Sequence, residues 1–229
     1  IARNADWVLP IHAGPEIGVA STKAFLGQMI VLYILCLKLG KSRKDIDDTV
    51  YHELLNRFKS LPESIKKTLK IESSIQSMAK EFIDAKGSMF LGRGYSFPIA
   101  LEGALKLKEL SYLHAEGYPA GEMKHGPLAL IEEGLPVIVI APKDKYFEKT
   151  LSNMQEVIAR GGKILFITDH KKELINENIR FGVRVPFVDT LLSPILFTIP
   201  IQLLAYHVAL LKGCDIDKPR NLAKSVTVE

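Results

Sequence analysis

Cysteine is scarce in this sequence and does not form the short spacings that hold a metal ion. The 229 residues contain only Cys36 and Cys214, and neither belongs to a CxxC or histidine–cysteine spacing typical of metal sites. Cys36 lies in an apolar run, where a cysteine usually acts as a small buried hydrophobe. We therefore expect no metal site and a reducing, cytoplasmic location.

Dense positive charge and long apolar runs are also missing. The net charge is only +4, and the lysine pair at 171–172 is followed at once by Glu173, so nucleic-acid binding is not favoured. The first ten residues carry charge where a signal peptide needs an apolar stretch. The most apolar segment, 29–37, is much shorter than the roughly 20 residues of a spanning helix. We interpret it as a core helix and expect no membrane association.

Strand-like and helical segments alternate over residues 88–213. Continuous apolar runs such as PVIVIAP are typical of parallel strands covered on both faces. This alternation predicts an α/β domain with a mostly parallel sheet sandwiched by helices. The predicted strands are 88–93, 136–142, 163–169 and 181–189; the predicted helices begin near Pro98, follow Tyr146, and run from Pro194 to Lys212, ending before Gly213.

The first part of the chain does not form a comparable unit. It reads as one strand at 6–11, a long helix capped by Ser21 and Gly40, and a charged helical pair over 42–72. One strand and one helix cannot close a sheet. We therefore predict one complete domain preceded by the truncated end of another. The predicted units are 1–70, with the end of the first domain and a connector; 71–213, the second domain; and 214–229, a C-terminal tail.

A polar stripe runs along the helix predicted after Pro98. At about 100° per residue, Glu102, Lys106 and Glu109 fall within roughly 60° of one another. The stripe is either a solvated row of ion pairs or the wall of a cleft, where Glu109 would serve as a base beside Lys106. The opposite face carries apolar side chains, at Leu101, Ala104, Leu105 and Leu107.

Three glycine-rich segments could form binding loops. Residues 117–127 follow the striped helix and hold Glu122, Lys124 and His125 together. A lone histidine in a loop is more often structural, but sites are commonly built on such loops. Residues 91–98 and 13–25 each precede a helix, where backbone N–H groups can face an anion. Ser21 in the second of these could equally be a simple helix cap.

Taken together, four segments resemble the C-terminal sugar isomerase (SIS) region of the glutamine–fructose-6-phosphate aminotransferase family, the glucosamine-6-phosphate synthases. They are GVASTKAF (18–25), LGRGYSFPIALEGALKLKE (91–109), AGEMKHGPLALI (120–131) and DKPRNLAKSVTVE (217–229). The resemblance follows the whole chain in order, and the last segment is the most specific. It implies two tandem SIS domains, of which 88–213 matches the second and 1–60 matches the end of the first.

The resemblance also implies an activity. Members convert fructose 6-phosphate and glutamine-derived ammonia to glucosamine 6-phosphate, without a metal or pyridoxal phosphate. Carried over by position, Glu109 moves a proton between C1 and C2, and Lys224 forms an imine with the open-chain ketose. His125 assists ring opening in the neighbouring subunit, which implies a homodimer or a larger homo-oligomer. The implied substrate-binding positions are Val19, Ala20, Ser21, Lys106 and Ala223.

Two family features are not found in this sequence: the glutaminase domain and the serine- and threonine-rich phosphate loops. We therefore expect a fragment of the synthase whose own activity is impaired. Two alternatives remain open: a sugar-phosphate deglycase or isomerase without a glutaminase domain, and a non-enzymatic SIS module that senses sugar phosphates. A sensor predicts a helix-turn-helix segment or a lost base, and a deglycase does not predict the PRNLAKSVTVE ending.

Overall fold

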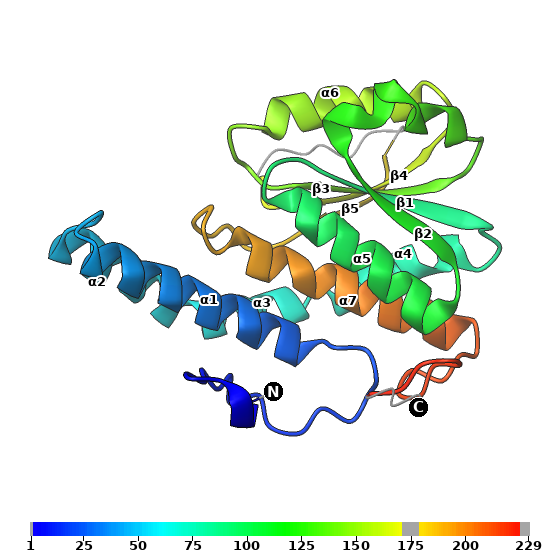
Figure 1. Cartoon of the computed structure of the whole chain (residues 1–229). Helices are drawn as coiled ribbons and strands as arrows, with labels where there is room; N and C mark the ends of the chain where they lie inside the picture. The colour runs from blue at the N-terminus through cyan, green and yellow to red at the C-terminus, as the bar shows by residue number, and fades with distance from the viewer. Residues whose placement is uncertain (1, 171–178, 225–229) are drawn as a thin grey trace.

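The computed structural model describes residues 2–170 and 179–224, and a parallel five-stranded sheet forms its centre (Figure 1). The strand order is β2-β1-β3-β4-β5, and every neighbouring pair is parallel. Each connection therefore crosses back over the sheet, as a βαβ unit requires. The strands are β1 (Gly87–Gly92), β2 (His114–Pro119), β3 (Pro136–Ala141), β4 (Lys163–Thr168) and β5 (Ile179–Arg184).

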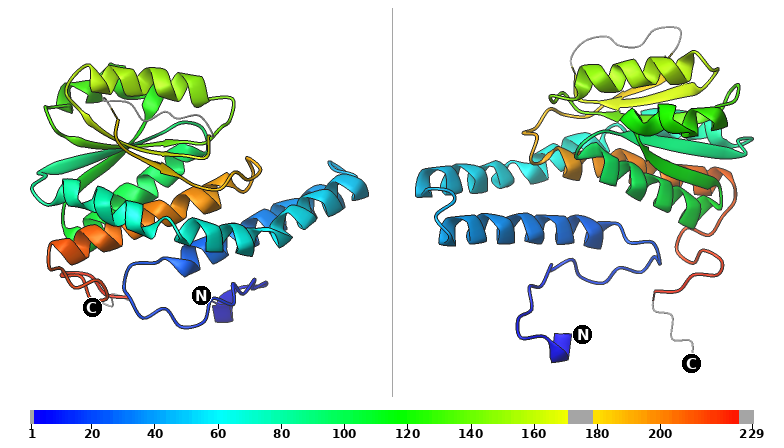
Figure 2. Two further views of the ribbon diagram at one scale, coloured as in Figure 1. Left: turned by 180° about the vertical axis from the view of Figure 1, so that it is seen from behind. Right: turned by 45° about the horizontal axis from the view of Figure 1, so that its top comes forward.

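Helices cover both faces of this sheet. The face turned towards α7 also carries α4 and α5, while α6 and the short helix η3 lie on the other face (Figures 1 and 2). The predicted α/β sandwich is thus confirmed. The helices are η1 (Ala2–Asn4), α1 (Lys23–Ser42), α2 (Asp48–Lys59), α3 (Leu61–Leu69), α4 (Glu72–Ala79), η2 (Lys80–Phe82), α5 (Ser96–Ser111), η3 (Ala120–His125), η4 (Pro127–Leu130), α6 (Phe147–Ile158) and α7 (Ser193–Leu211).

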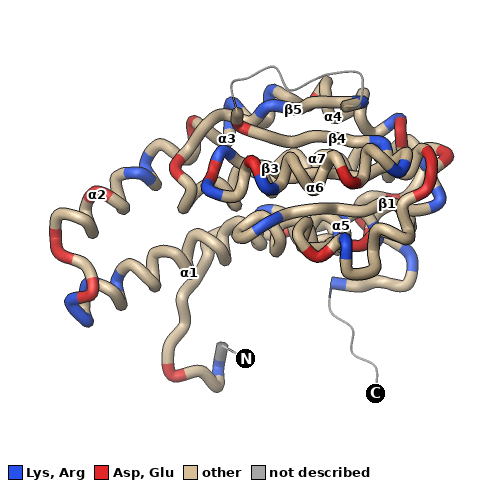
Figure 3. Tube along the Cα trace, turned by 90° about the horizontal axis from the view of Figure 1, so that it is seen from above, with Lys and Arg blue, Asp and Glu red and all other residues tan. Residues whose placement is uncertain are grey.

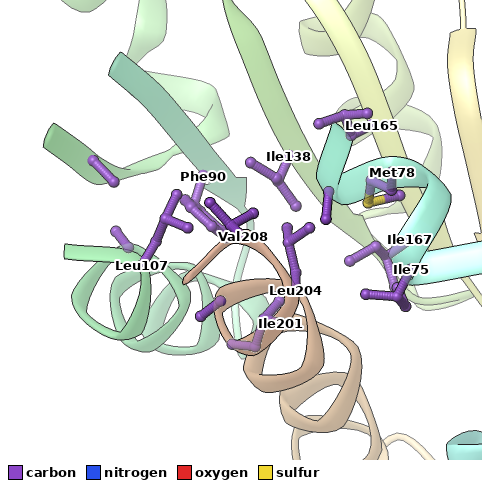
Figure 4. Packing of buried hydrophobic residues seen from close by; sticks show 14 of the residues in the cluster. Ile75, Met78, Phe90, Leu107, Ile138, Leu165, Ile167, Ile201, Leu204 and Val208 are labelled. Carbon is purple, nitrogen blue, oxygen red and sulfur yellow. The ribbon is translucent and has the colours of Figure 1, made fainter. Parts of the chain in front are cut away.

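The inner strands are apolar throughout because the sheet is buried on both sides. In β3, for example, Ile138 and Ile140 pack on the α5–α7 side, and Val137 and Val139 pack on the α6 side. Figure 4 shows the first of these cores, where side chains of α4, α5 and α7 meet the sheet. Its labelled members are Ile75, Met78, Phe90, Leu107, Ile138, Leu165, Ile167, Ile201, Leu204 and Val208.

The N-terminal part departs from the sequence predictions. Residues 6–11 form no strand, because no described segment pairs with their backbone. The long helix begins at Lys23 after an N-cap at Thr22, and it continues past Gly40 to Ser42. The caps predicted at Ser21 and Gly40 are therefore wrong. The predicted helical pair is present as α2 and α3, and the domain boundaries remain a prediction.

Helix α1 is not a core helix. Within α1 only Leu37 is buried, and Cys36 is exposed rather than packed inside. Its first half contacts the start of α7, where Leu26, Met29 and Ile30 pack around a small cluster; its members include Leu61, Leu192, Ile195 and Leu196. α1 and α2 extend beyond the sheet in Figure 2. Another side of α1 faces residues 9–12, and an outer row with Gln28, Leu32, Cys36 and Leu39 is exposed.

Two described helices, α1 and α7, are long and apolar enough to cross a membrane by length and composition alone. α7 meets this test as the buried central helix of a folded domain. α1 meets it with an exposed outer face, and one such helix near the N-terminus is weak evidence for a span. Figure 3 shows basic and acidic residues interspersed along the described chain.

Candidate active site

The C-terminal tail is attached to the end of α5 and to the segment before α1. The Arg220 backbone N–H donates to the Tyr112 hydroxyl at 2.8 Å, and the Arg220 guanidinium lies 4.2 Å from the centre of the Tyr112 ring. The Val19 N–H donates to the Asp217 carbonyl at 2.9 Å. Residues from opposite ends of the sequence are thereby joined beside α5.

A pocket of about 370 Å³ opens where these segments meet. The segment before α1 forms one wall, α5 and α7 contribute Leu110, Gln202 and Tyr206, and the tail closes a third side. The remaining lining residues are Pro15, Glu16, Ile17, Gly18, Ala20, Thr22, Lys23, Ile216 and Asp217. Of the predicted substrate-binding positions, Ala20 lines this pocket. Val19 and Ser21 flank Ala20, and Ala223 precedes the tail lysine.

Lys224 contacts two of the residues that line this pocket. Its Nζ donates to the Glu16 carboxylate at 3.0 Å and to the Gly18 carbonyl at 2.8 Å. The Lys224 side chain is 47% exposed, whereas that of Glu16 is 12% exposed. The tail lysine therefore docks on a covered carboxylate from a segment more than 200 positions away.

Glu16 is held in its charged form. Burial raises the pKa of this carboxyl, but hydrogen bonds from the Thr22 and Ala24 backbone N–H groups and the Lys224 ammonium more than offset burial and lower its pKa to about 2. The N–H groups belong to the first turn of α1, which lacks a side-chain cap from Thr22. Glu16 thus supplies the missing cap and stays an anion at neutral pH.

The predicted polar stripe on α5 is largely buried. Lys106 is 4% exposed in its side chain, with Glu102 at 7% and Glu109 at 24%. The solvated-row interpretation is therefore wrong. The apolar face is also misassigned in part, because Leu101 and Leu105 are exposed while Ala104 and Leu107 are buried. Ala104 and Leu107 of α5 point into the core. The polar stripe lies beside them, at the edge of the buried face of the helix.

Lys106 links two carboxylates that differ in environment. Its Nζ donates to Glu109 at 2.6 Å, a charge-assisted hydrogen bond. Its distance to Glu102 Oε1 is 3.6 Å, an ion pair too long for a hydrogen bond, and this buried oxygen has no donor. Burial raises the pKa of Glu102, and the charge of Glu109 adds to the rise against the opposing effect of Lys106. The stripe is therefore a compact acid–base cluster.

His125 lies apart from the other two predicted catalytic residues. It ends η3, six residues beyond the carboxyl end of β2, and it is exposed with Glu122 3.8 Å away. Glu109 lies near the C-terminal end of α5, which leads into the amino end of β2. Because β2 spans the sheet between them, His125 and Glu109 lie towards opposite edges. Within one chain, the structure does not bring them together.

Two functional candidates were not found by sequence reasoning. Glu102 was noted only as part of a stripe, and Glu16 was not singled out. A signal for Glu16 was available, because it is the only acidic residue between Asp6 and Asp45. The described residues, 2–170 and 179–224, contain no group of three or more His, Cys, Asp or Glu side chains that could hold a metal ion.

A parallel sheet between helices, with a pocket where a glycine-rich segment meets a folded tail, defines an α/β sandwich protein, and the comparisons identify its family. Residues 81–212 match the model of the SIS domain, so the chain belongs to the SIS domain family. It is 52% identical, over 230 aligned residues, to glutamine–fructose-6-phosphate aminotransferase (isomerizing) from Bartonella henselae. That alignment covers all of this chain and 38% of the relative, so the chain spans well under half of its length.

Two solved structures are also similar. The C-terminal domain of glucosamine-fructose-6-phosphate aminotransferase from Francisella tularensis is 44% identical, with a TM-score of 0.86 over 90% of this chain and 58% of that chain. Glucosamine-6-phosphate deaminase from Thermotoga maritima is 27% identical, with a TM-score of 0.64 over 93% of this chain and 59% of that one. The resemblance noted in the sequence is thus confirmed over the whole chain.

Proposed function

We propose that this chain is the isomerase part of a glucosamine-6-phosphate synthase, acting on fructose 6-phosphate and ammonia. The observation that carries the proposal is the position of Lys224, whose amine contacts the pocket residues Glu16 and Gly18. A tail lysine has no structural need to fold back this far. Its position suits an amine that must meet a sugar carbonyl.

In this proposal Lys224 acts as a nucleophile. Its neutral amine adds to the C2 carbonyl of the open-chain ketose, and the adduct loses water to give an imine. Ammonia then adds to the same carbon and the lysine amine leaves, so the new nitrogen stays on C2. The amine must lose its proton first, because a lysine with an ordinary pKa near 10.4 is mostly charged at neutral pH.

Glu109 is proposed as the base of the isomerisation. It takes a proton from C1, a proton returns to C2, and the C1 hydroxyl becomes the aldehyde of glucosamine 6-phosphate. Lys106 holds the Glu109 carboxylate in place through a 2.6 Å hydrogen bond. His125 would act from a second copy of the chain, since it lies towards the other edge of the sheet in its own chain.

Two other functions are less well supported. The similarity to a sugar-phosphate deaminase favours a related chemistry on the same fold, but it stands at 27% identity against 52% for the aminotransferase. A sensing module without catalysis has no need of the buried Glu102–Lys106–Glu109 cluster or of a docked tail lysine. Both alternatives share the sugar-phosphate pocket and differ in the fate of Lys224.

The decisive experiment replaces Lys224 in the full-length enzyme. A guanidinium stays protonated and cannot form an imine, so Lys224→Arg should abolish glucosamine 6-phosphate formation and leave glutamine hydrolysis measurable. Borohydride should trap fructose 6-phosphate on the wild type and not on this variant. Lys23→Arg, a change at a second lysine of the pocket, is the control and should still be trapped. Near wild-type synthesis by Lys224→Arg would refute the imine.

A further inference from the structure

The carboxylate of Glu16 faces two parts of the molecule at once. Its Oε1 accepts the Thr22 N–H at 2.9 Å, the Thr22 hydroxyl at 3.2 Å and the Ala24 N–H at 3.3 Å. Its Oε2 accepts the Lys224 ammonium at 3.0 Å. One oxygen is therefore fixed to the start of α1, and the other is presented to the tail.

This arrangement makes Glu16 a fixed acceptor. Three donors from α1 hold its Oε1, so the carboxylate cannot follow a moving lysine; the lysine must come to it. The Gly18 carbonyl, 2.8 Å from Lys224 Nζ, provides a second fixed acceptor. Two fixed acceptors define one position for a flexible amine, which is what a side chain with many rotamers needs to react in one geometry.

The charge around Lys224 is dominated by Glu16. The other charged groups of the pocket are Lys23, whose Nζ lies 2.5 Å from the Pro15 carbonyl, and Asp217. On the tail itself, Arg220 is stacked on Tyr112. The Tyr206 hydroxyl from α7 is the remaining titratable group of the lining. Among the described residues, the Glu16 carboxylate is the one that forms an ion pair with Lys224.

We propose that Glu16 is a positioning residue for Lys224: it docks the tail amine beside the pocket before sugar is bound. The inference rests on the proposed function, since it assigns Glu16 a role in the same site. The ligand-free chain then already holds its nucleophile in place. Removing the charge of Glu16 takes away one of the two acceptors of Lys224 and loosens the tail.

The test uses Glu16→Gln in the full-length enzyme. A glutamine Oε1 still accepts the Thr22 and Ala24 N–H groups, so the cap of α1 is kept while the ion pair to Lys224 is lost. We expect KM for fructose 6-phosphate to rise about 2- to 5-fold, the range of one partly exposed ion pair. We also expect borohydride trapping at Lys224 to slow at low fructose 6-phosphate and to recover at saturating fructose 6-phosphate, with kcat little changed.

Two variants serve as controls. Glu16→Asp keeps the charge and should bring KM back towards the wild-type value. Asp48→Asn breaks the exposed Lys41–Asp48 pair, which lies 2.7 Å apart on α1 and α2, and should change neither KM nor the trapping. If Glu16→Gln leaves both quantities unchanged while Lys224→Arg is inactive, Glu16 is only a helix cap and the inference fails alone. If Lys224→Arg is active, the imine role of Lys224 in the proposed function is refuted, whatever Glu16→Gln shows.

A measurement on the wild type covers the case in which Glu16→Gln does not fold. Reductive methylation at neutral pH, mapped by mass spectrometry without sugar, compares Lys224 with Lys67. Lys67 is 59% exposed and has only a 3.9 Å contact to Glu63. We expect Lys224 to react about 2- to 5-fold more slowly, because its Nζ is held against Glu16 and Gly18. Equal rates would overturn the inference.

Discussion

Lys106 carries a positive charge in a place that is almost closed to water. Its side chain is 4% exposed, and its ammonium lies between the carboxylates of Glu102 and Glu109. A buried charge is stable only while its partners remain, because water cannot replace them. Lys106 therefore has a structural role as well as the proposed catalytic one, and the two can be separated by measuring stability.

Replacing this lysine should be costly. We expect Lys106→Met to lower the free energy of unfolding by about 3 kcal/mol at pH 7, since it leaves two carboxylates without a counter-charge. Burial already raises the pKa of Glu102, so the folded state binds a proton more tightly than the unfolded state. The loss of unfolding free energy in Lys106→Met should therefore grow as the pH rises above 4.5 and through the raised pKa of Glu102. It should shrink again in acid.

The measurement is urea unfolding of both chains at several pH values. Lys67→Met provides a matched control, because Lys67 also pairs with a glutamate four residues earlier, at 3.9 Å, on the exposed surface of α3. Its loss should cost less than about 0.5 kcal/mol. A similar cost for the two variants would show that the α5 cluster is solvated in solution.

At the scale of elements, the packing of α5 on the sheet depends on a glycine. A Cβ at Gly103 would lie 2.6 Å from Phe90 Cε1 of β1 and 3.2 Å from Ile201 Cδ1 of α7. The helix can approach both neighbours closely only because this side chain is absent. The same helix passes over β2 at Gly117, where an added Cβ would lie 2.8 Å from the Leu101 nitrogen.

Alanine at this position should therefore destabilise the fold, although alanine is the better helix former. We expect Gly103→Ala to cost about 1–3 kcal/mol through overpacking. Gly40→Ala in α1 is the control, since its new Cβ would meet Ile46 at an ordinary 3.6 Å. That change should stabilise the chain by about 0.5–1 kcal/mol. Thermal unfolding of the two variants should show shifts of opposite sign.

Four of the five strands could be predicted from the sequence. β1, β3 and β4 are largely apolar because they are buried on both faces, and β5 combines a buried Ile179 and Val183 with exposed arginines. β2 could not. Its sequence, HAEGYP, contains Gly117 where α5 approaches and ends in proline, and as an edge strand only Ala115 is fully buried. The apparent strand at 6–11 has the right residues and no partner, and pairing is a property of the whole sheet.

The candidate site was predictable only in part. The stripe on α5 follows from helical spacing. Its burial depends on how α5 packs against the sheet and α7, and sequence periodicity does not predict that packing. The role of Lys224 came from resemblance, because nothing local distinguishes one tail lysine. Its docking on Glu16 joins residues 208 positions apart, and no pattern within a segment can reveal such a contact.

At the scale of the whole molecule, one chain does not assemble all the proposed catalytic groups in one place. Glu109 and Lys224 belong to the end of the molecule where the tail meets α5, and His125 follows the far end of β2. If all three act on one sugar, a second copy must bring its own His125 to the site. The active unit is then at least a dimer.

Mixed dimers test this arrangement. Neither His125→Ala nor Lys224→Arg should make glucosamine 6-phosphate efficiently as a full-length homo-oligomer. Coexpressed, they should form dimers with one intact site, combining Lys224 of one subunit with His125 of the other. Random pairing should restore about a quarter of the wild-type rate. No recovery in demonstrably mixed dimers would mean that His125 serves its own chain or has no role.

The joining of Glu16 to Lys224 also has a consequence for the order in which the chain folds. A contact across 208 positions is entropically costly to form in an open chain. Once the sheet, α5 and α7 have formed, Tyr112 and the start of α1 are already in place, and only the short tail remains to be ordered. The contact therefore belongs after the folding transition state. It contributes to the rate at which the native tail opens, and hardly at all to the rate at which the domain forms.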